Sequence, residues 1–163
     1  MATAGLSTTV QLWDVRKVPS FKKNSSKLPK ALAYQPARRS INSAYFSPSG
    51  KNLLTTTQSD KLEIIEDSHL ASGLMKPRTS IKHNNQTGRW LSTLMAKCHF
   101  PSAFTNHELF VVGPRCIELF ADNGDLMQEM SGEGLTAVAS RCCFHPNSKK
   151  LIVVGGDSSG RVR

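Results

Sequence analysis

The sequence predicts an all-β chain built from repeats of one short module. Trp13-Asp14 closes a strand-like stretch that begins at Ala2, and two later segments, Tyr45-Phe46-Ser47-Pro48-Ser49-Gly50 and Cys143-Phe144-His145-Pro146, repeat another part of that module. In a WD repeat, one strand ends in an aromatic-x-Pro turn, a second is small and apolar, and a third ends in Trp-Asp. The spacing therefore predicts a fragment of a WD-repeat β-propeller.

The length of the chain limits the number of blades. At roughly 40–45 residues per blade, 163 residues supply about three to four blades. Aligning the repeats predicts a partial blade over 1–40, blades over 41–91 and 92–134, and a partial blade over 135–163. Because the repeats begin and end inside a blade, we expect a fragment of a larger ring or a truncated gene product.

Each strand is expected where a short apolar or alternating run lies between turn residues. The expected strands are 2–4, 9–14 and 31–34 in the first blade, 41–46, 53–57, 61–65 and 73–75 in the second, 94–98, 109–112, 116–120 and 126–130 in the third, and 138–143, 151–155 and a start at 161 in the last. Two connections, Val15–Lys30 and Lys76–Leu91, are longer than blade turns require. Long loops on a rigid scaffold often carry binding function.

Composition narrows the class of protein. Residues 1–7 have no secretory pattern, and the longest aliphatic run, Leu151–Val154, is too short to cross a bilayer. The four cysteines form no C-x-x-C pair, so we expect small buried thiols in a reducing compartment.

The net charge is +9, and residues 1–51 contain nine Lys and Arg against Asp14 alone. This field suits nucleic acid or an acidic protein surface, although solubility is an almost equal alternative.

Antiparallel geometry divides the loops between two faces. Because the chain reverses at each turn, the connection between blades lies on the same face as the turn between a blade's second and third strands. That face is predicted to contain 35–40, 76–91, 114–115 and 157–160, with the cations Arg38, Arg39, Lys82, Arg89 and Arg115. The loop after Trp13-Asp14, which contains Arg16, is predicted on the opposite face.

Residues 81–91 combine cations, amides and an aromatic ring in one predicted loop. Lys82 and Arg89 can contact phosphates, and Trp90 can stack on an exposed base. The sequence offers many cations and few side chains arranged to read base edges, so we expect mainly phosphate contacts. The alternative is that Trp90 packs between blades.

The stretch Trp13-Asp14-Val15-Arg16 is a second candidate recognition site. Alternation along the strand predicts a buried Trp13, and the following turn presents the Arg16 guanidinium to a partner's carboxylate or carbonyl groups. The alternative is a local ion pair between Asp14 and Arg16, and the residues alone favour it.

Motifs for catalysis are absent from the sequence. There is no G-x-S-x-G elbow or P-loop, and the glycine-rich run Gly155–Gly160 lacks the lysine of a phosphate-binding loop. Cys98-His99 and Cys143-Phe144-His145 contain metal-ligand atoms, but their spacing assembles no tetrahedral set. We therefore expect a non-enzymatic protein with no metal or cofactor.

Four segments carry a resemblance to a known family. They are Ser40–Thr56, Ile81–Leu91 with its specific T-G-R-W-L element, Val112–Arg115 with Ile117–Phe120, and Gly155–Gly160. They resemble the C-terminal propeller of the WD-repeat-containing protein 76 family, whose fungal members are DNA-damage-binding WD proteins. This family is related to the small subunit of the damage-specific DNA-binding protein.

The resemblance implies a nuclear, chromatin-associated, seven-bladed protein of the DNA-damage response that binds DNA and serves a cullin-4 ubiquitin ligase as a substrate receptor. It implies that Trp13, Asp14 and Arg16 form the W-D-x-R box that docks on the ligase's adaptor protein. Gly88-Arg89-Trp90 occupies the place of the lesion-inserting hairpin of the damage-sensing relative, without that relative's finger residues. The alternative function is a protein-interaction scaffold whose basic face binds an acidic partner, such as a histone-binding factor.

Overall fold

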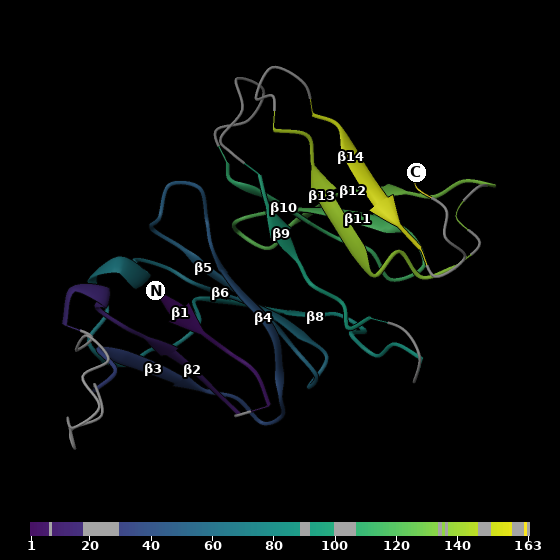
Figure 1. The fold of residues 1–163 in the computed structure, drawn as a ribbon. Helices are drawn as coiled ribbons and strands as arrows, with labels where there is room; N and C mark the ends of the chain where they lie inside the picture. The colour runs from purple at the N-terminus through teal and green to yellow at the C-terminus, as the bar shows by residue number, and fades with distance from the viewer. Residues whose placement is uncertain are drawn as a thin grey trace.

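The computed structural model of the chain describes residues 1–6, 8–17, 30–88, 92–99, 107–133, 135, 137–146, 151–157 and 162. Within these residues, strands form three four-stranded sheets and one two-stranded sheet, which follow one another along the molecule (Figure 1). The all-β WD-repeat prediction is confirmed. None of the described helices has the length and apolar character needed to span a membrane.

Four sheets are formed by the described strands. The first contains β1 (Ala2–Thr3), β2 (Thr9–Leu12), β3 (Ala33–Pro36) and β7 (Gly73–Leu74), and the second contains β4 (Ile41–Phe46), β5 (Leu53–Thr57), β6 (Lys61–Ile65) and β8 (Thr79–Lys82). The third contains β9 (Lys97–Cys98), β10 (Leu109–Val112), β11 (Ile117–Ala121) and β12 (Leu126–Met130), and the last contains β13 (Arg141–Phe144) and β14 (Val153–Gly156). Two short 3-10 helices, η1 (Val15–Lys17) and η2 (Ser68–Leu70), lie in the connections.

The outer strand of the second sheet differs from the prediction. The segment 73–75 was expected there, but its first two residues, β7, pair in parallel with β3 of the first sheet, with Leu74 opposite Tyr34. The outer strand is β8, which lies inside the predicted loop Lys76–Leu91. β8 has one apolar residue, Ile81, and this residue packs against the core between the second and third sheets. A single apolar position gives too weak an alternation to indicate a strand in the sequence.

Most other strands agree with the sequence to within a few residues. Five match the expected bounds: 41–46, 53–57, 61–65, 109–112 and 126–130. β2 ends at Leu12 before Trp13-Asp14, and β9 is restricted to Lys97–Cys98 although the expected strand began at 94. Most of the predicted loop Val15–Lys30 and the residues Arg89, Trp90 and Leu91 lie outside the described residues.

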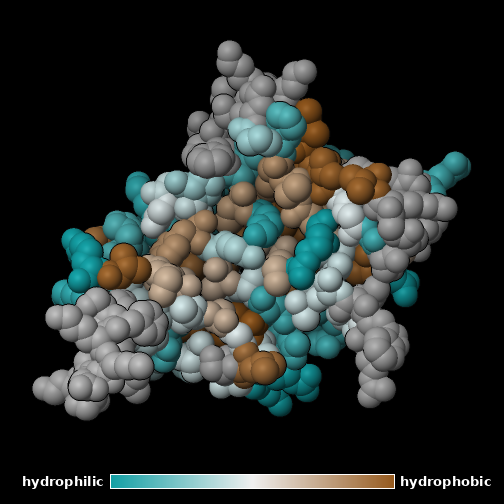
Figure 2. Space-filling view, in the orientation of Figure 1, coloured by the Kyte–Doolittle hydropathy of each residue, from teal (hydrophilic) through white to brown (hydrophobic). Residues whose placement is uncertain are grey.

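The core lies between successive sheets. Leu54, Leu62 and Ile64 of the second sheet pack against Phe110, Val112 and Phe120 of the third, and the rings of Phe110 and Phe120 stack with centroids 5.2 Å apart. Similar apolar layers join the first sheet to the second and the third to the fourth. Apolar side chains also reach the surface near the last sheet, where Leu151 and Ile152 are exposed (Figure 2).

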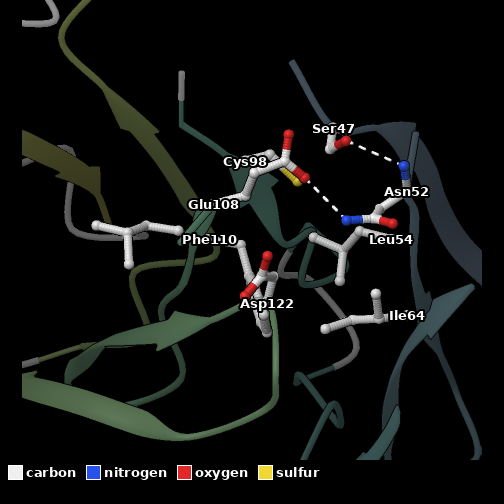
Figure 3. A pocket seen from close by; sticks show the side chains of 9 residues that line it. Ser47, Asn52, Leu54, Ile64, Cys98, Glu108, Phe110 and Asp122 are labelled. Carbon is white, nitrogen blue, oxygen red and sulfur yellow. Dashed lines mark hydrogen bonds between the residues drawn. The ribbon is translucent and has the colours of Figure 1, made fainter. Parts of the chain in front are cut away.

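One end of the interface between the second and third sheets is closed by a carboxylate. Glu108 accepts a hydrogen bond from the backbone N–H of Ser49 and another from the side-chain amide of Asn52, each at 3.0 Å. Glu108, Asn52 and Cys98 line a cavity of about 10 Å³ (Figure 3), which is about the space that one water molecule needs. Burial raises the pKa of Cys98 to about 12.

Candidate nucleic-acid interface

Exposed cations from several loops share one face of the molecule. Backbone hydrogen bonds tie the loops together, from Gln58 N–H to the Ser40 carbonyl at 2.8 Å and from Ala139 N–H to the Pro114 carbonyl at 3.2 Å. The described exposed cations here are Arg38, Arg39, Lys61, Lys82 and Arg115, which we call the basic face. The structure thus brings together four of the five predicted cations, and the fifth, Arg89, lies outside the described residues.

The base of the loop after β8 is held by buried polar contacts. Asn85 donates from its side-chain amide to the carbonyls of Thr57 at 2.8 Å and Lys61 at 3.0 Å, and its backbone N–H donates to the Asp60 carboxylate at 3.0 Å. Gln86 donates to the Gln58 carbonyl at 2.9 Å. The turn between β5 and β6 therefore fixes the loop that leads to Arg89 and Trp90. In the sequence, only the position of Asn85 near His83 in a polar stretch marks this residue, and that does not indicate its structural role.

Lys61 and Lys82 are directly opposite each other across β6 and β8, and both are exposed. Like charges in this arrangement destabilise a sheet unless an anion lies close to them. Among the described residues, no carboxylate forms an ion pair with any cation of the basic face. Sequence analysis did not select Lys61, because the partnership depends on β8, which the sequence placed in a loop.

Arg115 lies on the turn between β10 and β11, beside a hollow of about 300 Å³. The other described residues that line the hollow are Leu135, Ala137 and Val138. A cation in the lining of such a hollow can hold an anionic group.

Trp13 is less buried than the sequence predicts. Val10 and Leu12 face the core, so the alternation of β2 leaves Trp13 on the other side of the strand, where it is half-buried. Its indole N–H donates to the hydroxyl of Thr3 at 2.8 Å, and its backbone N–H donates to the Met1 carbonyl at 2.8 Å. The predicted burial of Trp13 is therefore wrong: the buried positions of the strand are Val10 and Leu12, and Trp13 follows directly after them.

Asp14 and Arg16 form the local ion pair. Arg16 donates from Nε and Nη2 to the two carboxylate oxygens of Asp14, each at 2.9 Å, and its backbone N–H donates at 3.1 Å. These hydrogen bonds lower the pKa of Asp14 to about 2. The Arg16 side chain is still 86% exposed, because the contacts lie along one edge of the guanidinium group. Arg16 therefore remains accessible with its orientation set by Asp14.

The cysteines are less uniformly buried than expected. Cys142 is buried, Cys98 and Cys116 are half-buried, and Cys143 is exposed; all four are free thiols. The His99 ring lies edge-on to Phe144, with centroids 4.6 Å apart. His99 therefore has a packing contact, whereas the exposure of Cys143 contradicts its predicted place in the core.

No family model matches the chain, but individual relatives do. Over 99% of its length, the chain is 31% identical to "DNA damage-binding protein CMR1" of Chaetomium globosum and 30% identical to "DNA damage-binding protein cmr1" of Neurospora crassa. Over 98% of its length, it is 35% identical to "WD repeat-containing protein 76" of Mus musculus. The chain spans 32% of each fungal relative and 24% of the mouse relative. The resemblance predicted from the sequence is confirmed.

Proposed function

We propose that this chain, a homologue of WD-repeat-containing protein 76 and of fungal DNA damage-binding proteins, supplies a DNA-contacting face to a non-enzymatic, nuclear WD-repeat protein of the DNA-damage response. The observation that supports this most directly is the basic face, where exposed cations on tied loops have no ion-pair partner among the described residues. Phosphates of a DNA backbone are ligands for such a surface.

In the proposed binding mode, the protein contacts the phosphate backbone of DNA and makes few contacts with the edges of the bases. Arg38 and Arg39 contact phosphates at one edge of the basic face. Lys61 and Lys82, which lie opposite each other, bind one phosphate between them. Asn85 and Gln86 hold the base of the loop, so that Arg89 and Trp90 are presented from a fixed support. The contact of Trp90 with a base stays a prediction from the sequence.

A salt titration of DNA affinity tests this proposal. Each lost phosphate contact reduces the log–log salt slope by roughly 0.9 for duplex DNA, so Lys82→Ala and Arg39→Ala should each flatten it by about that amount. Lys51→Ala is a matched control, because Lys51 is exposed on the turn between β4 and β5, at the opposite end of the strands. Equal slopes in all four proteins would remove the basic face from the DNA site.

The loop tip needs a separate comparison of intact and distorted duplexes. Arg89→Ala should flatten the salt slope, because it removes a phosphate contact. Trp90→Ala should leave the slope unchanged and weaken binding by roughly 1–3 kcal/mol only where an unpaired base is available for stacking. A Trp90→Ala protein with unchanged affinity and a lower melting temperature would place this ring in the core between blades.

We also propose that the opposite face docks a cullin-4 ligase adaptor through Trp13, Asp14 and Arg16, as the family resemblance implies. The Arg16 guanidinium is exposed and held in orientation by Asp14, which favours recognition of a carboxylate or carbonyl group. Arg16→Ala in the full-length protein should weaken capture of the adaptor and leave DNA affinity unchanged. Unchanged capture would show that this assignment is wrong.

The second candidate function is a chromatin scaffold whose basic face binds an acidic protein, such as a histone-binding factor. The same cations favour it, because carboxylates and phosphates both pair with arginine. Competition distinguishes the two functions: an acidic partner that binds the chain while duplex DNA fails to displace it would favour the scaffold. Displacement at equal salt would favour a shared DNA site.

A further inference from the structure

A cluster of metal-ligating side chains lies on the third sheet, on the side that faces the second. The Cys116 Sγ atom and one carboxylate oxygen each of Glu118 and Glu129 lie within 4.8 Å of one another. Cys116 and Glu118 are two residues apart, so they project from the same side of the chain. Glu129 on β12 is directly opposite Glu118 on β11. The pairing of these strands therefore brings together a sulfur and two carboxylates.

The two carboxylates of this cluster are opposed like charges in the metal-free protein. Opposed glutamates repel each other across a sheet, and within the described residues no Lys or Arg forms an ion pair with either of them. The Cys116 thiol donates one long hydrogen bond to Glu118 Oε1, at 3.7 Å. Burial, and then the charges of Glu118 and Glu129, raise the pKa of Cys116. A cation among the three groups would remove this repulsion.

An independent observation at the same place is the orientation of His83. Its side chain is 4% exposed, and Nε2 lies 3.2 Å from Glu118 Oε2 without the geometry of a hydrogen bond, so this buried nitrogen has no hydrogen-bond partner. The other ring nitrogen, Nδ1, lies 2.6 Å from Asn85 Oδ1. The Asn85 amide nitrogen already donates to two backbone carbonyls, so Oδ1 is the atom that faces His83.

The side-chain amide of Asn85 therefore determines which imidazole nitrogen of His83 carries the hydrogen. Because Asn85 Oδ1 can only accept, His83 Nδ1 is the donor, and in the neutral ring the lone pair is on Nε2. Two acceptor atoms, His83 Nε2 and Glu118 Oε2, then lie 3.2 Å apart, a contact that a proton or a metal ion close to both atoms would relieve. A metal-ligating histidine typically donates its other N–H to an oxygen acceptor, as His83 does here.

We propose that Cys116, Glu118, Glu129 and His83 form a binding site for a divalent transition-metal ion, with zinc as the best match to the donor atoms. Zinc takes thiolate, imidazole and carboxylate ligands in a tetrahedral arrangement, whereas calcium and magnesium require oxygen ligands. Bond lengths of roughly 2.0–2.3 Å place tetrahedral ligand atoms about 3.3–3.8 Å apart. Binding therefore requires side-chain rotations that draw together the atoms of Cys116, Glu118 and Glu129, which lie within 4.8 Å of one another, and His83, which lies against Glu118. The Cys116 thiol releases its proton to solvent on binding.

The consequence for the fold is a link between neighbouring sheets. Glu118 and Glu129 belong to the third sheet, Cys116 immediately precedes β11, and His83 follows the outer strand of the second sheet. A bound ion would therefore tie the two sheets at the end where the basic face lies. It would also neutralise the two carboxylates near that face.

Metal titration of the full chain tests the site. The protein is reduced, stripped with a chelator, and titrated with Zn²⁺ by calorimetry and with Co²⁺ by absorption spectroscopy. We expect one ion per chain and a thiolate-to-cobalt charge-transfer band. Cys116→Ser should abolish this band, and Glu129→Gln should lower zinc affinity at least tenfold. Because Glu129 is exposed, its variant keeps the fold intact.

Two matched controls separate the cluster from adventitious binding. Cys143→Ser removes an exposed thiol, and Glu133→Gln removes an exposed carboxylate, both outside the cluster. Neither should change the cobalt band or the zinc affinity. The proposal is overturned if the wild type shows no sulfur-to-cobalt band, or if Cys116→Ser and Glu129→Gln bind zinc as tightly as the controls. In that case a proton lies between His83 and Glu118.

Discussion

The two ends of the interface between the second and third sheets use glutamate in opposite ways. At one end, the Glu108 carboxylate accepts hydrogen bonds from Ser49 and Asn52, which are neutral donors. At the other end, Glu118 is opposite Glu129 and lies near the thiol of Cys116 and the bare nitrogen of His83. Glu108 accepts from two nitrogen donors, whereas the only hydrogen bond to the carboxylate of Glu118 among the described residues is the long one from the Cys116 thiol. A buried carboxylate stabilises a fold only when donors surround it.

Replacing Phe120 with alanine should have the largest effect, because this ring supports both ends. Phe120 is buried, stacks on Phe110, and contacts the His83 ring edge-on with centroids 6.3 Å apart. We expect Phe120→Ala to lower the free energy of unfolding by about 3–5 kcal/mol, measured by urea denaturation. Phe46→Ala is the control, because Phe46 is 37% exposed and should cost much less. Equal losses would show that the two sheets are not packed through Phe120.

Removing Glu108 should destabilise the satisfied end. Glu108→Ala leaves the donors of Ser49 and Asn52 without their acceptor, and hydrogen bonds to a charged group contribute about 1.5–3 kcal/mol. Because the site is partly open to solvent, we expect a loss of about 1.5 kcal/mol in the same measurement. Glu133→Ala, at an exposed position, should change stability by less than about 0.5 kcal/mol. Similar values for the two variants would remove the role of Glu108 in joining the sheets.

The pH dependence of the free energy of unfolding tests whether hydrogen bonds stabilise the charged form of Glu108. Burial acts to raise the pKa of Glu108, but hydrogen bonds from Ser49, Ser47 and Asn52 outweigh it and lower that pKa below 4.5. A lowered folded-state pKa gives stability that is present above the unfolded-state value and is lost as pH falls through the folded-state value. The stability difference between wild type and Glu108→Gln should therefore shrink as pH falls below 4.5. A constant difference from pH 7 downward would contradict the assigned cause.

Changing Glu129 should have the smallest effect on stability, and the opposite sign. Glu129→Lys turns a like-charge pair with Glu118 into an opposite-charge pair, which is worth about 0.2–1 kcal/mol across a sheet. We expect the metal-free variant to be more stable than the wild type by that amount, measured in the presence of a chelator. Gln128→Lys is the control, because Gln128 is opposite Leu119 instead. A less stable Glu129→Lys protein would mean that Glu129 already has a favourable partner.

The strands that sequence analysis located correctly are those with several apolar residues between clear turns. β5 and β10 are buried along their whole length, so their composition alone indicates a strand. β8 has only Ile81 to mark it and was placed in a loop, while Gly73–Leu74 was placed in the wrong sheet. A two-residue parallel pairing between sheets leaves no periodic signal in the sequence.

The candidate sites also contain residues that the sequence indicated and residues that only the structure revealed. Arg38, Arg39, Lys82 and Arg115 were selected because loop direction in an antiparallel repeat follows from strand order. Lys61 was missed because its partnership with Lys82 requires the register of β6 and β8. Cys116, Glu118 and Glu129 were not grouped for a similar reason, since ten residues and a turn separate Glu118 from the opposed Glu129.

The sequence by itself determined the repeat and the class of fold, because turn residues and apolar runs act locally. Only the tertiary structure decided which side chains meet: Lys61 with Lys82, Glu118 with Glu129, and His83 with Glu118. These contacts depend on strand register and on packing between sheets, and a shift of one residue in a strand would move each side chain to the other face.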